Sequence, residues 1–393
     1  MLLLDLTHTS HTRARTGIQR VARALWRQLG ANAMPVTRDP FLGGWRPLEP
    51  WELANLASTQ GSERRHARWP WSAKWRSRFR RILRRNAPHL LTGNFTGSIE
   101  PELFSPVVGR ELPRVFARVR GPRVALFHDA ISLRLPELTP PAMVARLPGY
   151  LHELLQFDGI AAISEDSRDS LLGYWRWLGV PDTPPVIALP LGVDPSPAGV
   201  DRAPPSSAAP PVILSVGTLE GRKNHLALFA ACEMLWVAGV AFTLRVIGHA
   251  DAPTGGAALE RIRALQASGR PVRYDGPADD PTIAAAYDEC AFTVYPSLAE
   301  GFGLPVIESL ARGRPCICLG RGALGEISRA GGCVPLDNVE PPTLAQAIRR
   351  LLESPSELQA LSATASARRF NDWATYTAEL TDWIATLRRR NSV

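Results

Sequence analysis

The amino-acid sequence predicts an α/β protein with two doubly wound domains, each a parallel sheet covered by helices on both faces. Short apolar runs rich in β-branched residues alternate with helical stretches along most of the 393 residues. These runs lack the polar alternation of a half-exposed sheet, which indicates parallel strands buried on both faces. A segment rich in proline, serine and alanine divides the chain near residues 195–210, so two separate domains are expected.

The first half is the less regular one. The apolar run at residues 1–6 contains the acidic Asp5 and no basic residue before its apolar residues. It therefore fits a buried strand better than a signal peptide. Between about residues 31 and 120 the pattern assigns no strand. The expected strands are 2–6, 124–127, 159–163 and 186–189, and the expected helices are 18–29, 142–156 and 166–178.

The second half alternates clearly. Its expected strands are 212–216, 242–247, 291–295 and 316–319, and its expected helices are 225–237, 256–267 and 305–311. The chain ends in an amphipathic helix whose apolar face holds Trp373, Tyr376, Leu380, Trp383, Ile384 and Leu387. The predicted organisation is an N-terminal domain at 1–195, a linker at 196–211, a C-terminal domain at 212–370 and a final helix at 371–393 that packs back on the N-terminal domain.

Composition excludes several classes of protein. Hydrophobic residues make up 45% of the chain and charged residues 21%, which excludes a wholly disordered protein. No apolar run approaches the roughly 18 residues of a membrane-spanning helix. The cysteines are odd in number and irregularly spaced, so we expect buried thiols in a reducing cytoplasm and neither disulfides nor a zinc site. They are Cys232, Cys290, Cys316, Cys318 and Cys333.

The net charge of +8 comes from one segment, residues 62–85, which holds ten Lys and Arg against one Glu. Four apolar residues of that segment, Trp71, Trp75, Phe79 and Ile82, fall on one helical face. Basic charge beside an aromatic face is typical of a helix that lies on an anionic membrane. A solvated helix and a nucleic-acid site are the alternatives. We expect the membrane surface, and no nucleic-acid partner, because nothing else in the chain suggests one.

The segment from Pro296 to Glu308 is the strongest candidate binding site, because it follows a strand, where doubly wound sheets hold their ligands. Gly301 and Gly303 allow a tight turn with exposed N–H groups just before a helix. Glu300 and Glu308 can hold two hydroxyl-bearing parts of one ligand. Either glutamate alone is more often a capping carboxylate, so the whole segment carries the prediction.

Other residue patterns narrow the chemistry. Arg222 and Lys223 follow a strand and a glycine turn, where adjacent cations can neutralise a diphosphate. No G-x-G-x-x-G follows the first strand, so a nicotinamide cofactor is not expected. Asp279 and Asp280 stand in a proline-flanked turn, which does not suit a metal site.

The string from Glu300 to Glu308 around Gly-Phe-Gly-Leu-Pro resembles the E-x7-E signature of glycosyltransferase family 4, whose members have the GT-B fold with an interdomain cleft. Further segments resemble the same family. They are 215–224, 127–129 with 135–137, 163–167, 190–194, and Asp5 with 16–20. The resemblance covers about residues 1–30 and 123–390.

The resemblance implies a role for each matched residue. The expected catalytic residues are Glu300 and His128, the latter near the reacting face of the transferred sugar. The diphosphate would be held by Arg222, Lys223 and Gly17, the ribose by Glu308, and the donor sugar by Glu300, Phe302, Gly303 and Leu304. Thr218 stands where the family often has a further arginine, which would weaken the phosphate contacts or leave them to another residue. The loop 11–16 is a candidate acceptor contact, and His225 is expected on a helix surface.

The implied function is a retaining, metal-independent glycosyltransferase without a cofactor, with an acceptor-binding N-terminal domain and a nucleotide-sugar-binding C-terminal domain. The segment 16–18 resembles mannosyltransferases, which favours mannose from GDP-mannose as the transferred sugar. The acceptor would be a glycan or lipid-linked glycan in polysaccharide or lipopolysaccharide biosynthesis, and the location cytoplasmic, at the inner face of the membrane. Two alternatives stay open: another GT-B enzyme such as a nucleotide-sugar epimerase, and an inactive protein that binds sugar nucleotides or nucleic acid.

Overall fold

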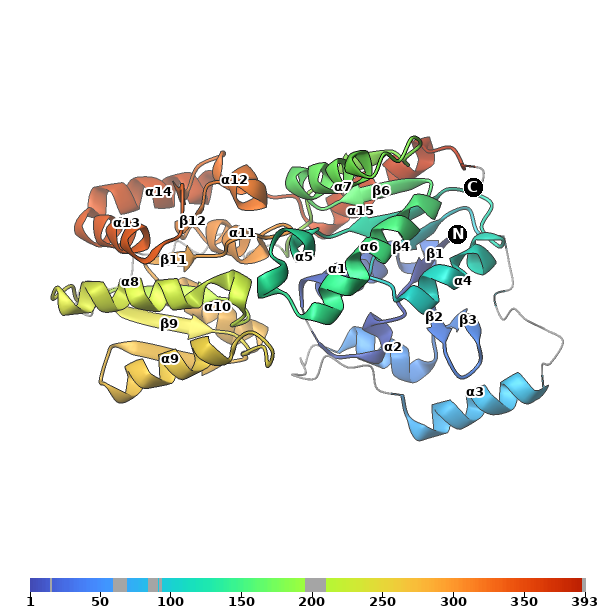
Figure 1. The fold of residues 1–393 in the computed structure, drawn as a ribbon, viewed down its shortest axis with the longest axis horizontal. Helices are drawn as coiled ribbons and strands as arrows, with labels where there is room; N and C mark the ends of the chain where they lie inside the picture. The colour runs from blue at the N-terminus through green and yellow to red at the C-terminus, as the bar shows by residue number, and fades with distance from the viewer. Residues whose placement is uncertain (15, 59–68, 84–90, 92–93, 195–209, 391–393) are drawn as a thin grey trace.

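Two α/β domains lie side by side in the computed structural model, which describes residues 1–14, 16–58, 69–83, 91, 94–194 and 210–390 (Figure 1). Each domain has its own sheet with helices packed on it. The predicted fold class, two Rossmann-like domains, is therefore confirmed.

The N-terminal sheet has the strand order β3-β2-β1-β4-β5-β6-β7 within the described residues. All of its neighbouring strands are parallel except the hairpin of β2 and β3. The strands are β1 (Leu2–Asp5), β2 (Ala33–Asp39), β3 (Gly44–Pro47), β4 (Ser98–Glu100), β5 (Arg123–Phe127), β6 (Gly159–Ala162) and β7 (Val186–Ala188). The helices are α1 (Gly17–Leu29), α2 (Pro50–Ala57), α3 (Trp71–Leu83), α4 (Pro106–Phe116), α5 (Ile131–Arg134), α6 (Pro141–Glu153) and α7 (Glu165–Trp177).

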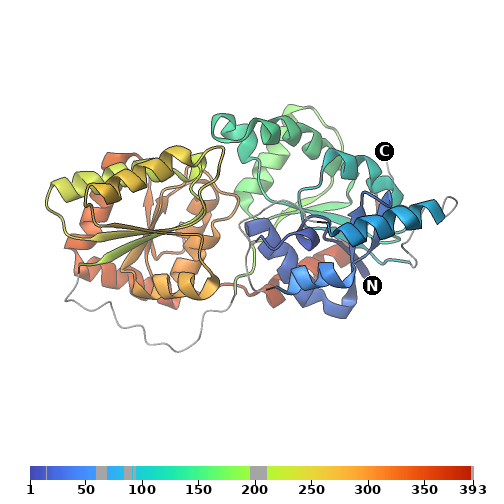
Figure 2. The ribbon, with the colours of Figure 1, turned by 90° about the horizontal axis from the view of Figure 1, so that it is seen from below.

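The C-terminal sheet is wholly parallel, with the doubly wound order β10-β9-β8-β11-β12-β13. Figure 2 shows this sheet between two layers of helices. Its strands are β8 (Val212–Val216), β9 (Thr243–Ile247), β10 (Val272–Gly276), β11 (Phe292–Tyr295), β12 (Cys316–Leu319) and β13 (Cys333–Leu336). The helices are α8 (His225–Val237), α9 (Gly256–Ala267), α10 (Asp280–Glu289), α11 (Leu304–Ala311), α12 (Gly322–Ser328), α13 (Pro341–Glu353), α14 (Pro355–Ala367) and α15 (Trp373–Thr386).

Both faces of the N-terminal sheet are buried, as the unbroken apolar runs predict. Successive residues of a strand point to opposite faces. Leu4 and Leu126 belong to one buried cluster, whereas Leu3 and Ala125 belong to the cluster on the other face. All five cysteines are buried and free, in agreement with the expected thiols.

The stretch between residues 31 and 120, where the sequence pattern assigns no strand, contains β2, β3 and β4. The strand β4 is only three residues long, and its outer residues Ser98 and Glu100 are polar although they are buried. Two strands of the second half also lack a clear pattern. The edge strand β10, for example, carries the exposed Arg273.

The final helix, α15, packs against α1 of the N-terminal domain. Trp373, Tyr376, Leu380 and Ile384 are buried there, and the other two residues of the predicted apolar face are partly buried. The chain thus crosses between the domains twice. The two crossings meet where the backbones of Val193 and Asp372 form a β-bridge. The predicted linker lies almost entirely outside the described residues.

Candidate active site

Glu300 is the centre of a cluster of charged residues at the carboxyl ends of β8 and β11. Its carboxylate accepts hydrogen bonds from Lys223 Nζ at 2.6 Å, Arg222 Nη1 at 2.8 Å and the Tyr295 hydroxyl at 3.0 Å. Only 8% of Glu300 is exposed. The structure therefore brings together three residues to which the sequence assigns the donor sugar and the diphosphate.

Burial and charge act against each other on these groups. Burial alone would raise the pKa of Glu300, but Arg222 and Lys223 outweigh it and lower that pKa to about 2. Burial lowers the pKa of Lys223, and Glu300 opposes that effect. Glu300 is therefore a fixed anion at neutral pH and a hydrogen-bond acceptor, not a proton donor.

Local backbone structure delivers the two cations to this point. They lie on a 3₁₀ turn, Gly221–Lys223, between β8 and α8. The turn is tied to the Glu300 loop, because the backbone N–H of Leu298 donates to the carbonyl of Arg222 at 2.9 Å. Arg222 also pairs with Glu220 at 2.7 Å, a partner that the sequence pattern did not reveal.

The Glu300 loop meets the N-terminal domain at Gly301. A Cβ added there would lie 2.6 Å from the carbonyl oxygen of His128, so only glycine fits. The hydroxyl of Ser164 donates to the Gly301 carbonyl at 2.7 Å. The carboxylate of Glu326 accepts the backbone N–H groups of Asp166 at 2.6 Å and Glu165 at 2.9 Å. The domains therefore touch at the candidate site.

His128 follows β5 and is buried beside this junction. Its Nε2 lies 2.8 Å from the Pro101 carbonyl, which can only accept, so Nε2 carries the proton. Burial lowers the pKa of His128, which keeps the ring neutral at pH 7 and leaves Nδ1 as an acceptor.

Glu308 lies on α11, the helix that follows the glycine loop. Its carboxylate is bound by Arg20 Nη1 at 2.6 Å and by the Tyr287 hydroxyl at 3.2 Å. Gly303 precedes this helix with a φ of +108°, a conformation that favours glycine. Its neighbours in the sequence, Phe302 and Leu304, are buried.

Gly17 is the first residue of α1, and an added Cβ would meet no atom within 4 Å. Packing therefore does not demand glycine here. The N-terminal turn of α1 is held by a capping box between Thr16 and Gln19, so the helix start is well defined.

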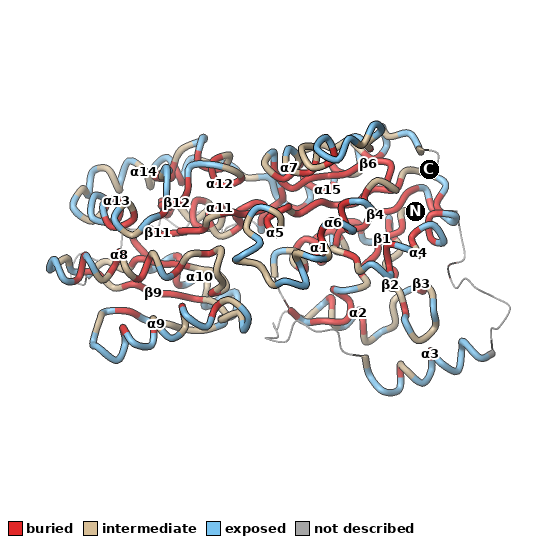
Figure 3. The backbone as a smooth tube through the Cα atoms, in the orientation of Figure 1, coloured by how far each residue is buried: buried red, intermediate tan, exposed pale blue. Residues whose placement is uncertain are grey.

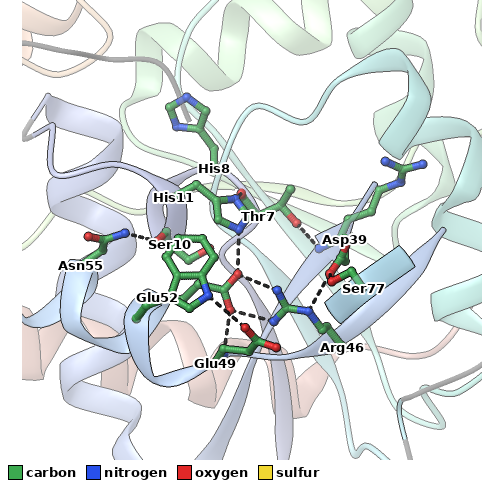
Figure 4. A network of polar contacts seen from close by, with 12 residues as sticks. Thr7, His8, Ser10, His11, Asp39, Arg46, Glu49, Glu52, Asn55 and Ser77 are labelled. Carbon is green, nitrogen blue, oxygen red and sulfur yellow. Dashed lines mark hydrogen bonds and ion pairs between the residues drawn. The ribbon is translucent and has the colours of Figure 1, made fainter. Parts of the chain in front are cut away.

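In the loop 11–16, His11 and Thr12 are buried, whereas Arg13 is exposed. The acceptor contact of this loop stays a prediction. Figure 4 shows His11 between Thr7 and Glu52. Its two ring nitrogens lie 2.7 Å from the Thr7 carbonyl and 2.8 Å from Glu52. The expectation that His225 lies on a helix surface is wrong. His225 is buried, and burial together with Lys223 lowers its pKa to about 3. The local sequence around His11 and around His225 does not indicate that either side chain is buried.

The helix α3 carries a second candidate surface (Figure 3). Its predicted apolar face points to solvent: Trp71, Trp75, Phe79 and Ile82 are 75%, 53%, 61% and 68% exposed. The opposite face is the one that docks, through a hydrogen bond of 2.6 Å from Ser77 to Asp39. The rest of the predicted basic segment, 62–68 and 84–85, lies outside the described residues.

Within the part of the chain that the structure describes, no helix is both long and apolar enough to cross a membrane. The same described ranges contain no group of three or more His, Cys, Asp or Glu that could hold a metal ion.

A family model matches most of the C-terminal domain. The model of the glycosyl transferases group 1 matches residues 210–354, which include the whole Glu300 cluster. Residues 210–354 are thus similar to the domain that this family shares.

Curated relatives extend the likeness to the N-terminal domain. The serotype-specific mannosyltransferase WbdA of Escherichia coli is 26% identical over 332 residues, which cover 80% of this chain and 38% of WbdA. The chain thus spans well under half of that relative. The O-antigen chain mannosyltransferase B of Escherichia coli is 26% identical over 65% of this chain and 68% of its own length.

Among solved structures, Anabaena HepE, described in complex with UDP and glucose, covers 98% of this chain and 99% of its own, with a TM-score of 0.68 and 15% identity. At that identity the likeness concerns the fold, which is the GT-B arrangement of two Rossmann-like domains.

Proposed function

We propose that the chain is a retaining, metal-independent glycosyltransferase that transfers mannose from GDP-mannose to a glycan or lipid-linked glycan in polysaccharide biosynthesis. The observation that carries the proposal is the convergence of Arg222 and Lys223 on Glu300 inside the matched family domain. The names of the mannosyltransferase relatives support the choice of sugar.

The family resemblance implies the course of the reaction, and the charges of this site fit it. When a donor binds, Arg222 and Lys223 turn from Glu300 to the diphosphate, and Glu300 accepts hydrogen bonds from sugar hydroxyls. The cations then stabilise the charge that grows on the departing diphosphate. The bond from the sugar carbon to the phosphate oxygen breaks, and a bond to the acceptor oxygen forms on the same face. The acceptor proton passes to the departing phosphate, so no protein nucleophile is needed.

Lys223→Ala tests the donor site directly. We expect the affinity for GDP to fall roughly 10- to 150-fold, because a charge-assisted contact to the diphosphate is worth ~1.5–3 kcal/mol. Isothermal titration calorimetry with GDP, and with UDP in parallel, measures the effect. Lys74→Ala is the matched control, because Lys74 is the chain's other lysine and lies on α3. Equal affinities in the wild type and the Lys223 variant would contradict the site.

We further propose that α3 holds the protein on an anionic membrane, at the inner face of the cytoplasmic membrane. Arg78 and Arg81 are exposed beside the apolar face, and each cation near an anionic surface contributes about 1 kcal/mol. Arg76 and Arg80 instead pair with Glu49 at 2.7 and 3.2 Å, which fastens the helix to the domain. The exposed aromatic face is thereby presented outward.

A combined Trp71→Ser, Trp75→Ser and Phe79→Ser variant should stop sedimenting with vesicles that contain phosphatidylglycerol. These side chains provide the apolar insertion. Binding of the wild type should weaken with salt, because the Debye length falls from ~10 Å at 0.1 M to ~3 Å at 1 M. Trp177→Ser on α7 is the control, because that tryptophan is 80% exposed on another helix. If the wild type stays in solution at low salt, or binds nucleic acid equally well, the membrane proposal is wrong.

A further inference from the structure

Arg20 joins three parts of the chain at the candidate site. It lies on α1, three positions after Gly17, and therefore on the same face as the helix start. Its Nη1 lies 2.6 Å from Glu308 of the C-terminal domain, and its Nη2 lies 3.6 Å from Asp194, just before the predicted linker. About a third of its side chain, 32%, is exposed.

The chemical order of a nucleotide sugar relates this ion pair to the phosphates. In such a donor the ribose is joined to the α-phosphate, and the sugar to the β-phosphate. The proposed function assigns the ribose to Glu308 and the sugar to Glu300. A cation paired with Glu308 therefore lies at the α-phosphate end, and cations paired with Glu300 lie at the β-phosphate end.

The charge balance of the Glu300 cluster indicates that a third cation is needed when a diphosphate binds. Arg222 and Lys223 are balanced by Glu220 and Glu300 in this structure. A diphosphate brings at least two further negative charges, so two cations alone leave the loaded site short of positive charge. The sequence has Thr218 where a further arginine was expected from the family resemblance.

We propose that Arg20 binds the α-phosphate of the donor and that Glu308 holds it in the free protein. The proposal rests on the proposed function, because it takes the nucleotide diphosphate as given. On binding, the ribose hydroxyls occupy Glu308, and the guanidinium of Arg20 turns to the phosphate, whose oxygens it can bind with two parallel N–H groups. The Tyr287 hydroxyl, 3.2 Å from Glu308, continues to orient the carboxylate. Donor binding thus exchanges one ion pair for another across the two domains.

The test compares nucleosides with their mono- and diphosphates in Arg20→Gln. Guanosine, GMP and GDP are titrated by calorimetry, and uridine, UMP and UDP in parallel. We expect Arg20→Gln to lower the affinities for the mono- and diphosphate by the same factor, roughly 10-fold or more, and to leave the affinity for the nucleoside unchanged. Lys223→Ala should weaken only the diphosphate. Arg27→Gln, two turns further along α1 and exposed, is the matched control.

Other results would overturn the inference in distinct ways. If Arg20→Gln binds the nucleoside monophosphate as tightly as the wild type or more tightly, Arg20 is a contact between the domains that competes with the donor. If Arg20→Gln loses as much affinity for the nucleoside as for its phosphates, Arg20 acts only through Glu308. If Lys223→Ala has its effect and Arg20→Gln has none, the inference fails while the proposed function stands; if the wild type binds none of these nucleotides, both fail. Should Arg20→Gln not fold, Arg20→Lys serves instead, and a several-fold loss confined to the phosphates is expected because lysine lacks the planar fork.

Discussion

Glu300→Gln should lower kcat for sugar transfer by at least about 100-fold, the usual effect of removing one preorganised polar contact to a transition state. The carboxylate has two negative oxygens and the amide only one neutral acceptor, so the substituted side chain would turn an NH₂ group toward Arg222 or Lys223. Because Lys223 is buried, it would also lose the partner that keeps its charge favourable. The variant therefore changes both the sugar contact and the readiness of the cations for the diphosphate.

Turnover with a confirmed donor, measured at saturating substrate, provides the test. Thermal unfolding of the same sample shows whether the domains remain folded. Glu357→Gln is the matched control, because it removes a carboxylate that pairs with Arg350 on the surface far along the chain. Near-normal turnover in a folded Glu300→Gln protein would remove Glu300 from the catalytic residues.

Much of this site was predictable because its residues follow strands. In a parallel sheet the carboxyl ends of neighbouring strands meet at one edge. Arg222 and Lys223 follow β8, and Glu300 follows β11, the strand paired with it. Once the doubly wound order is inferred from the pattern, these three residues are expected to lie together.

The contacts between the domains were not predictable in the same way. Arg20 and Glu308 are 288 positions apart and belong to different domains. No periodicity or spacing specifies how two domains dock, so nothing in the sequence connects this pair. Gly301 looks like any turn glycine until the carbonyl of His128 is found against it.

The burial of polar residues such as His11 and His225 was not predictable from the local sequence. His11 looks like a loop residue in the sequence, yet it bridges Thr7 and Glu52. Such a residue is stable inside because both ring nitrogens have partners, one of them, Glu52, 41 positions away in the sequence. The local sequence pattern predicts which apolar residues are buried. It does not predict which polar residues are buried with their hydrogen bonds satisfied.

Asp158→Asn should destabilise the N-terminal domain by ~3–5 kcal/mol, the usual cost of leaving one partner of a buried ion pair uncompensated. Asp158 precedes β6, and Arg123 begins β5; both are at least 98% buried. The carboxylate of Asp158 accepts hydrogen bonds from Nε and Nη2 of Arg123, each at 2.7 Å, and from the backbone N–H of Arg390 at 2.6 Å. The same aspartate therefore neutralises a charge in the core and fastens the segment that follows α15.

Calorimetric unfolding, with the transition of each domain followed separately, measures the effect of Asp158→Asn. Asp182→Asn is the matched control, because Asp182 also pairs with Arg390 but is 77% exposed, and exposed pairs contribute about 0–1 kcal/mol. Asparagine keeps the shape of the side chain, so a large loss would come from the charge of Arg123, left without a partner in a buried place. GDP affinity should persist below the unfolding transition, because the donor residues lie mainly in the other domain. A loss no greater than that of Asp182→Asn would mean that water reaches Arg123 and that the buried ion pair is not needed for the stability of the domain.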